Sequence, residues 1–290
     1  PALSESEPVS QRGMVWLCGN HRVMCGDSTS PEDVRKLMAG QQVGLCFTSP
    51  PYGQQRDYED AKEMVKDWDG LMQGVFSNVA EKSDTQILVN LGLIHKGELW
   101  EYWRGWIEWM RQQGWKFYSQ YIWDQGSGLP GNFSGRLAPS YEIIFHFNKT
   151  SREVSKTKDK KEENIGLSTN KGMRDKKGVV NPFSNRESSL SPVKIPDNVI
   201  RTFRQLARDE FTTQHPAVFP VNLCKEIILP FTTEREICYE PFCGSGTQVI
   251  ACEETKRVCY GMELTPKYVD VIVKRWQQFT GKGATLENDG

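Results

Sequence analysis

The sequence predicts an α/β protein with a mostly parallel β-sheet covered by helices on both faces. Three observations lead to this fold class. Short runs rich in β-branched and aromatic residues alternate with segments of helical period. The apolar run 43–47 leads to a pair of prolines, which cannot continue a ladder of hydrogen bonds. A second run, 236–241, enters a glycine-rich turn directly before a helical segment.

The first half of the chain supplies the expected alternation. Gly19-Asn20 predicts a hairpin between residues 15–18 and 21–25. Ser30 as N-cap and Pro31 at the first helical position predict a helix over 31–38. Further strands are expected at 43–47, 85–91, 116–123 and 141–147, and helices at 57–79 and 98–112. Four tryptophans at three-residue spacing in the last helix favour a core-facing helix over an exposed stacking platform.

The second half begins with a long segment, 150–195, that has no apolar period and is rich in Lys, Ser, Asn and Gly. Insertions of this length in compact domains are functional or disordered. Beyond it, helices are expected at 197–208, 221–229, 247–254 and 266–279, and strands at 236–241 and 258–264. We expect residues 1–13 to be disordered and residues 281–290 to form a flexible tail.

Composition narrows the class of protein. Of the 290 residues, 38% are hydrophobic and 25% charged, which is typical of a soluble globular protein. No apolar run reaches the ~20 residues that a membrane helix needs, and the N-terminus shows no secretory signal. The eight cysteines are scattered and form no CxxC pair. This pattern predicts reduced, buried thiols in an intracellular protein rather than a zinc site or a disulfide framework.

The net charge of −1 hides an uneven distribution. From Lys149 to Lys177 the chain has ten Lys or Arg and five Asp or Glu, so this stretch carries +5 and the remainder −6. A basic segment on an acidic body is suited to contact phosphates, which favours a nucleic acid as partner. A solvated, disordered loop is compatible with the same charges.

Thr48-Ser49-Pro50-Pro51-Tyr52 is the first of two motifs that carry chemistry. It lies at the carboxyl end of a predicted buried strand, where open α/β sheets bind ligands. The motif displays a hydroxyl, a rigid backbone carbonyl and an aromatic ring together. That combination suits modification of an amino group on a flat heterocycle, although a plain strand-ending turn explains the motif taken alone.

The second motif, residues 240–247, reads Glu-Pro-Phe-Cys-Gly-Ser-Gly-Thr and joins a strand to a helix. Val249 stands where a dinucleotide-binding turn has its third glycine, and no Gly-Lys-Ser/Thr follows, so a ligand without a pyrophosphate fits better. Glu263 ends the next predicted strand, about 20 residues on, where a carboxylate can accept both hydroxyls of a ribose. Glycine-rich turn and carboxylate together predict a nucleoside-containing ligand.

Both motifs resemble those of DNA amino-methyltransferases: residues 48–52 are similar to the catalytic motif, and residues 240–247 to the S-adenosylmethionine (SAM) motif. The catalytic motif comes first, with a variable segment between, which resembles the β group of this family and most of all its N4-cytosine enzymes. The resemblance covers about 15–280. It implies a Rossmann-like, SAM-dependent methyltransferase fold with a mostly parallel seven-stranded sheet and helices on both faces.

The resemblance also implies the site residues. Tyr52 would stack on a base flipped out of the duplex, while the Ser49 hydroxyl and the Pro50 carbonyl accept hydrogen bonds from its amino group. The catalytic set is Ser49, Pro50, Pro51 and Tyr52. The cofactor-binding set is Asp27, Ser28, Thr48, His215, Pro216, Phe219, Phe242, Cys243, Gly244, Ser245, Gly246, Thr247, Glu263 and Leu264. No metal is expected, because the sulfonium of SAM is already activated.

The first residue of the catalytic motif bears on the target base. In the family, Ser occurs there mostly in N4-cytosine enzymes and Asp or Asn in most adenine enzymes, so Ser49 favours cytosine N4. Adenine N6 is the alternative. An alternative from another class is a DNA-binding adaptor that has lost catalysis, whose sign would be a broken motif. One departure from the family is Asp124-Gln125, where an Asn/Asp-Lys pair is typical.

In the terms of the family, residues 14–149 form the catalytic half of the domain and 196–280 its SAM-binding half. The basic insertion 150–195 lies where the β group keeps its target-recognition region. We expect double-stranded DNA as partner, a monomer or homodimer, and an intracellular location with the DNA. The DNA-binding set is Arg136, Lys156, Lys158, Lys160, Lys161, Lys171, Arg174, Lys176 and Lys177.

Overall fold

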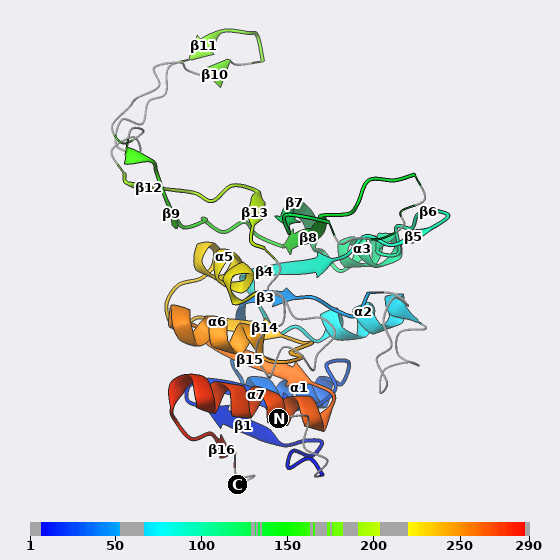
Figure 1. Cartoon of the computed structure of the whole chain (residues 1–290), viewed down its shortest axis with the longest axis vertical. Helices are drawn as coiled ribbons and strands as arrows, with labels where there is room; N and C mark the ends of the chain where they lie inside the picture. Colours follow the sequence, from blue (N-terminus) through cyan, green and yellow to red (C-terminus); the bar gives the residue numbers. More distant parts are fainter. Residues whose placement is uncertain are drawn as a thin grey trace. The chain divides into compact units, whose positions relative to one another are not determined.

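The computed structural model of the chain (Figure 1) contains two compact units. Unit 1 consists of Pro1–Glu153 and Asn198–Gly290, and unit 2 of Val154–Asp197. The structure describes residues 7–52, 67–128, 131, 133, 135–162, 165, 173–174, 176–181, 191–203 and 220–287.

One sheet forms the centre of unit 1, and within the described residues it has ten strands in the order β13-β7-β8-β4-β3-β14-β15-β2-β1-β16. The predicted seven strands run from β7 to β2, and three short strands extend the sheet at its two sides. The strands are β1 (Val15–Cys18), β2 (His21–Cys25), β3 (Val43–Thr48), β4 (Glu81–Leu91), β7 (Lys116–Asp124), β8 (Tyr141–Asn148), β13 (Val199–Arg201), β14 (Ile237–Glu240), β15 (Val258–Glu263) and β16 (Thr285–Leu286).

Strand direction places several strand ends at one edge of the sheet. β4, β3, β14, β15 and β2 pair in parallel. β8 runs antiparallel to both β4 and β7, so β7 points the same way as β4. The carboxyl ends of β7, β4, β3, β14, β15 and β2 therefore share one edge with the beginning of β8. We call this the carboxyl edge, and it is where a doubly wound sheet binds ligands.

Helices cover both faces of this sheet. They are α1 (Pro31–Met38), α2 (Trp68–Ser77), α3 (Arg104–Gln112), α5 (Val221–Phe231), α6 (Thr247–Thr255) and α7 (Pro266–Thr280). Helices α1 to α3 pack into one apolar cluster with alternate strand residues such as Met24, Cys46 and Ile87. Their strand neighbours, such as Val23 and Leu45, are equally buried on the opposite face, where α5, α6 and α7 contact the sheet.

Several expected elements are confirmed with small shifts of their ends. Ser30 caps α1, accepting a hydrogen bond from the Asp33 N–H, and Pro31 begins the helix. Trp106 of α3 is fully buried and Trp103 nearly so, which confirms a core-facing helix. All eight cysteines are buried and free, as the sequence predicts. No helix of the described part is long and apolar enough to cross a membrane.

Two predicted helices are wrong in part. The helix expected from residue 98 begins only at Arg104, because residues 98–99 form the short strand β6 (Glu98–Leu99), paired with β5 (His95–Lys96). The helix expected at 197–208 is replaced at its start by β13, which pairs in parallel with β7. Two β-branched residues, Val199 and Ile200, suit that edge pairing. Residues 57–66 and 204–208 of the expected helices lie outside the described residues.

The predicted disorder at the two ends of the chain is also wrong for its described parts. The N–H groups of Val9 and Ser10 and the Ser10 hydroxyl donate hydrogen bonds to the Asp270 carboxylate in α7. At the other end, β16 pairs antiparallel with β1. Both segments are ordered by partners distant in sequence, which local composition cannot reveal.

Unit 2 contains two short antiparallel ladders in the segment whose sequence shows no apolar period. β9 (Lys158–Asp159) pairs with β12 (Val193–Lys194), and β10 (Met173–Arg174) pairs with β11 (Val180–Asn181). Its bounds, 154–197, lie close to the predicted insertion of 150–195.

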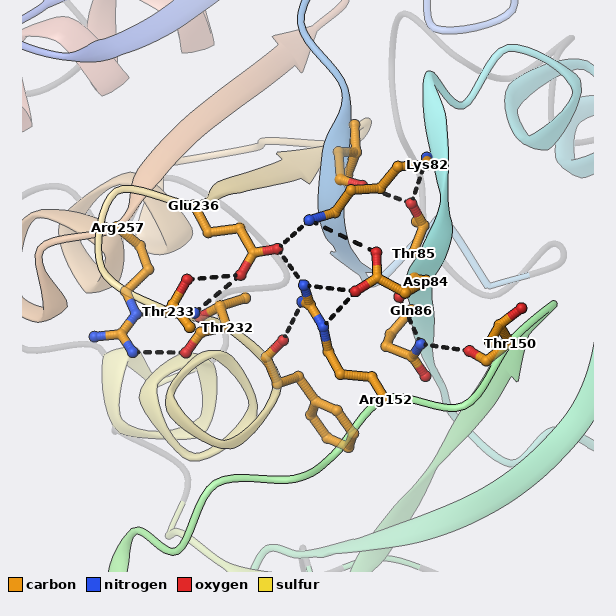
Figure 2. Close-up of polar contacts among 12 residues, drawn as sticks. Lys82, Asp84, Thr85, Gln86, Thr150, Arg152, Thr232, Thr233, Glu236 and Arg257 are labelled. Carbon is orange, nitrogen blue, oxygen red and sulfur yellow. Dashed lines mark hydrogen bonds and ion pairs between the residues drawn. The ribbon is translucent and has the colours of Figure 1, made fainter.

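Arg152 fixes the last residues of unit 1 before the chain enters unit 2. Figure 2 shows its guanidinium between Asp84 and Glu236, with the Phe231 carbonyl accepting a further bond at 2.7 Å. Lys82 adds an ion pair to Glu236 with an Nζ–Oε1 distance of 2.6 Å. Burial alone would raise the pKa of Glu236, but the bonds from Arg152, Lys82 and the Thr233 N–H lower it to about 2.

Candidate active site

The carboxyl edge brings both sequence motifs together, as predicted. Ser49 to Tyr52 follow β3, and Pro241 to Gly246 follow β14, which is hydrogen-bonded to β3. Glu263 ends β15 on the other side of β14, and Asp27 follows β2 on the far side of β15. Two motifs nearly 200 residues apart are therefore neighbours.

A buried carboxyl group joins the two motifs. The Thr48 hydroxyl donates a hydrogen bond to Glu240 Oε1, and the Phe242 N–H donates to the same oxygen at 3.1 Å. Burial raises the pKa of Glu240 to about 8, although both hydrogen bonds oppose the shift. Thr48 is itself fully buried, so its hydroxyl links the strands here, and its assignment to the cofactor stays a prediction.

The proline pair is fixed by an aromatic side chain from α2. Trp68 donates its indole N–H to the Pro51 carbonyl at 2.9 Å. The Tyr52 ring lies against Gly92, just beyond β4, where an added Cβ would come within 2.6 Å of the ring. A glycine is needed at position 92 for this close approach. Both contacts define where the Ser49 and Tyr52 side chains lie.

Three polar side chains meet at the Tyr52 hydroxyl. It donates to Glu142 Oε2 at 2.7 Å, and Ser49 Oγ lies 3.0 Å away. Asn90 donates to Tyr52 Oη at 2.9 Å and to Glu142 Oε2 at 2.6 Å. Burial and then the neighbouring Glu142 raise the pKa of the Tyr52 phenol well above its usual value, so the phenol stays protonated. These residues come from the segment after β3 and from strands β4 and β8.

The glycine-rich turn has the backbone conformation its sequence indicates. Gly244 and Gly246 have φ values of +54° and +76°, a region that favours glycine. A Cβ on Gly246 would also approach Ile272 of α7 to 2.7 Å. Arg275 of α7 holds the turn from outside, donating to the Ser245 carbonyl at 3.0 Å and to the Thr247 hydroxyl at 3.1 Å.

The N–H groups of this turn are largely used within the protein. Besides Phe242, Cys243 donates to Met262, Gly244 to Glu263 Oε2 at 2.8 Å, and Gly246 to Cys243. In this turn Phe242 and Gly244 are half-buried, whereas Cys243, Ser245 and Gly246 are buried. Ligand contact is therefore expected through the Phe242 ring and the Gly244 backbone.

Glu263 fits the part of a ribose-binding carboxylate. Its two oxygens accept the N–H groups of Gly244 and Thr265, which fixes their orientation and leaves further lone pairs on each oxygen. The side chain is half-buried, and burial raises its pKa to about 7. A nucleoside with two vicinal hydroxyls can donate to such a group, so the residues present fit the nucleoside part of SAM.

The acidic turn after β2 lies beside this group. Asp27 Oδ1 accepts hydrogen bonds from the N–H and the hydroxyl of Thr29, both at 2.8 Å, and the residue is half-buried. Ser28 is buried and donates to the Pro241 carbonyl at 2.7 Å, so it ties this turn to the glycine-rich turn. Leu264 is half-buried next to Glu263. His215, Pro216 and Phe219 lie outside the described residues.

The predicted DNA-binding residues are distributed over both units. Arg136 is exposed in the loop before β8 of unit 1. In unit 2, Lys156, Lys161, Lys176 and Lys177 are exposed, and Lys158 and Lys160 are half-buried. Arg174 belongs to β10, and Lys171 lies outside the described residues. Their contact with DNA stays a prediction.

Sequence reasoning missed the parts of the site that come from β4 and α2. Asn90 and Gly92 lie at and just beyond the carboxyl end of β4, where position alone marks them as candidates. Trp68 gives no local signal, because its role depends on how α2 packs against the Pro51 loop. At the end of β7, the Gln125 amide is 3% exposed and neither of its polar atoms has a hydrogen-bond partner.

A comparison with known protein families matches residues 43–274 to the DNA methylase family of N6 and N4 methyltransferases. Among curated relatives, the type II methyltransferase M.Cfr9I of Citrobacter freundii is 27% identical over 168 residues, 58% of this chain and 47% of the relative. The orphan methyltransferase M.BamHII of Bacillus amyloliquefaciens is 24% identical and covers 86% of this chain and 94% of the relative. The chain thus spans about half of M.Cfr9I and nearly all of M.BamHII.

Two solved structures share the fold. The cytosine-N4-specific PvuII DNA methyltransferase has a TM-score of 0.62 and 18% identity, covering 91% of this chain and 87% of the other. M1.HpyAVI in complex with SAM has a TM-score of 0.53 and 16% identity, covering 87% and 98%. Fold, motif order and the family match over most of its length lead to one conclusion: the chain belongs to the DNA methylase family, as a DNA amino-methyltransferase of the β-group type.

Proposed function

We propose that the protein transfers a methyl group from SAM to the exocyclic N4 of cytosine in double-stranded DNA. The observation that carries the choice of base is Ser49, the half-buried first residue of the catalytic motif. A neutral hydroxyl at this position favours N4-cytosine chemistry within the family. The likeness in fold to an enzyme named as cytosine-N4-specific supports the same choice.

The residues of the carboxyl edge act by position and electrostatics. A target cytosine flipped out of the duplex stacks on the Tyr52 ring. Its amino hydrogens are accepted by the Ser49 hydroxyl and the Pro50 carbonyl, which draws the nitrogen toward tetrahedral geometry and makes its lone pair available. SAM supplies an activated methyl group for in-line attack, with its nucleoside part at Glu263, Asp27 and Phe242.

We propose that unit 2 contributes to recognition of the DNA through its lysines. Lysines that contact DNA phosphates release counterions from the DNA, so the affinity of unit 2 for DNA should fall as the salt concentration rises. Neutralising Lys156, Lys161, Lys176 and Lys177 together should weaken DNA binding and flatten its salt dependence, while SAM binding is unchanged. A restriction-modification role is the corresponding proposal for the cell, since the relatives include type II methyltransferases.

Nucleoside mass spectrometry of methylated DNA tests the target base. We expect N4-methylcytosine after digestion of DNA incubated with the protein and SAM. N6-methyladenine without N4-methylcytosine would establish the alternative amino group. Failure to bind SAM, with retained DNA binding, would instead support the inactive adaptor.

A further inference from the structure

The hydrogen bonds around Tyr52 have only one consistent direction. The phenol has a single hydrogen, and it is donated to Glu142 Oε2 at 2.7 Å. Ser49 Oγ, at 3.0 Å from Tyr52 Oη, must therefore donate its own hydrogen to the phenol oxygen. The chain of donors runs from Ser49 through Tyr52 to Glu142.

The hydrogen bonds of Asn90 support the same direction of donation from Ser49 to Glu142. Its amide nitrogen donates to Tyr52 Oη at 2.9 Å and to Glu142 Oε2 at 2.6 Å, so the Tyr52 oxygen already receives a hydrogen and gives its own away. The Asn90 side chain is fully buried, and its carbonyl oxygen has no partner. A buried acceptor without a partner costs about 1–3 kcal/mol, so this contact by itself lowers the stability of the fold.

The arrangement has a direct consequence for Ser49. Because its only hydrogen points to Tyr52, the Ser49 oxygen acts as an acceptor: Asn90 Nδ2 donates to it at a long 3.5 Å, and its remaining lone pair can accept a hydrogen from outside. An exocyclic amino group has hydrogens to donate and is held by an acceptor. The half-buried Ser49 hydroxyl is thus held in an accepting orientation by Tyr52 and Glu142. Hydrogen bonds that point to a carboxylate also strengthen one another, which makes Ser49 a better acceptor.

We infer that Ser49, Tyr52 and Glu142 form a proton relay in which Glu142 sets Ser49 as an acceptor and takes up the proton released by the substrate amine. This inference rests on the proposed methyl transfer. When the N–CH3 bond forms and the S–CH3 bond breaks, the amino nitrogen becomes cationic. Its proton passes to Ser49 Oγ, the Ser49 hydrogen passes to Tyr52 Oη, and the Tyr52 hydrogen passes to Glu142, which ends neutral.

Two isosteric substitutions test the relay. Tyr52→Phe keeps the stacking ring and removes the central hydroxyl. Glu142→Gln keeps an oxygen that can accept from Tyr52 and Asn90, but it cannot take up a proton. We expect each to slow single-turnover methyl transfer about 100-fold, within the range of positioned acid–base groups, with dissociation constants for SAM and DNA unchanged. Matched controls are Tyr118→Phe and Glu108→Gln, at exposed positions distant from the motif in sequence.

The pH dependence separates a relay from a purely structural contact. The wild-type rate should vary with pH, because the relay ends on an acidic side chain, whereas the Glu142→Gln rate should be low and flat over the same range. A wild-type rate in Tyr52→Phe would overturn the relay. A wild-type rate in Glu142→Gln would overturn Glu142 as the proton acceptor.

A spectroscopic readout judges the relay without turnover. With tyrosine labelled at 13Cζ, the Tyr52 resonance, assigned from its absence in Tyr52→Phe, should move with pH in the wild type and should stay fixed in Glu142→Gln. An invariant Tyr52 resonance in the wild type would overturn the relay even if the protein methylated no DNA. Loss of wild-type methylation with an intact titration would overturn the proposed function and support the hydrogen-bonded chain.

Discussion

Thr48 and Glu240 are hydrogen-bonded to each other at the carboxyl ends of adjacent strands, one at the start of residues 48–52 and the other at the start of residues 240–247. The Glu240 carboxyl is 2% exposed, and its second contact is the Phe242 N–H. One buried acid thus sets the relative position of the two parts of the site.

Substitution of this acid has a pH-dependent effect on stability. The folded-state pKa of about 8 lies above the usual value of 4.5, so ionisation favours the unfolded chain and stability falls as pH rises from about 4.5 to 8. Glu240→Gln keeps both hydrogen bonds and cannot ionise. We expect it to exceed the wild type by on the order of 3 kcal/mol at pH 9 and to match it near pH 5 in urea unfolding. If Glu240→Gln and the wild type differed in the free energy of unfolding by the same amount at pH 5 and pH 9, the raised pKa of Glu240 would be contradicted. Glu108→Gln is the control.

Removal of the Ser49 hydroxyl should affect turnover and leave cofactor binding intact. Ser49→Ala loses the acceptor for the substrate amine, and we expect kcat to fall about 100-fold. The SAM dissociation constant, measured by calorimetry, should stay within about twofold of the wild-type value, because the proposed contact of Ser49 is with the target base and not with the nucleoside part of SAM. Ser77→Ala, in an exposed position of α2, should change neither quantity.

A side chain at Gly244 should have the opposite effect. Its φ of +54° is strained for a β-branched residue, so Gly244→Val distorts the turn that carries Phe242 and donates to Glu263. We expect the SAM dissociation constant to rise at least about tenfold, which corresponds to ~1.4 kcal/mol. Gly283→Val is a matched control, since a Cβ there meets nothing within 4 Å. Unchanged SAM affinity in Gly244→Val would contradict the placement of the cofactor.

The half-buried ion-pair cluster of Arg152, Lys82 and Glu236 predicts a second dependence on pH. The pKa of Glu236 is lowered to about 2, so its ionised form stabilises the fold above pH 4.5, and this contribution is lost as pH falls from about 4.5 to 2. Glu236→Gln leaves Arg152 and Lys82 without this partner. We expect a loss of about 2–3 kcal/mol in the free energy of unfolding at pH 7 and a smaller loss at pH 3. A constant loss over that range would contradict the depressed pKa.

Gln125 offers a stabilising substitution. Both polar atoms of its buried amide are without partners, and such groups cost about 1–3 kcal/mol. Gln125→Met has a similar shape and should raise the thermal midpoint by about 2–4 °C. Gln120→Met, at an exposed position of β7, should have no such effect. A lower midpoint in Gln125→Met would show that the amide is paired in the folded protein.

The elements near the site were predictable to the extent that their signals are local. The Pro50-Pro51 pair ends a buried strand wherever it occurs, and the glycines at 244 and 246 have the positive φ that their pattern indicates. The start of α3 and the strand β13 were not predictable, since both depend on pairing with distant segments. The order at residues 9–10 and 285–286 likewise comes from Asp270 and β1.

The sequence by itself determined the α/β class, the two motifs and their order along the chain. These follow from strand-ending prolines, glycine conformation and the alternation of apolar periods, which act over a few residues. Tertiary structure decided that Thr48 bonds to Glu240, that Asn90 and Glu142 surround the Tyr52 hydroxyl, and that the turn uses its own N–H groups internally. Side chains from separate strands meet only when the sheet is formed, so the direction of the Ser49 hydrogen bond depends on strand order and register.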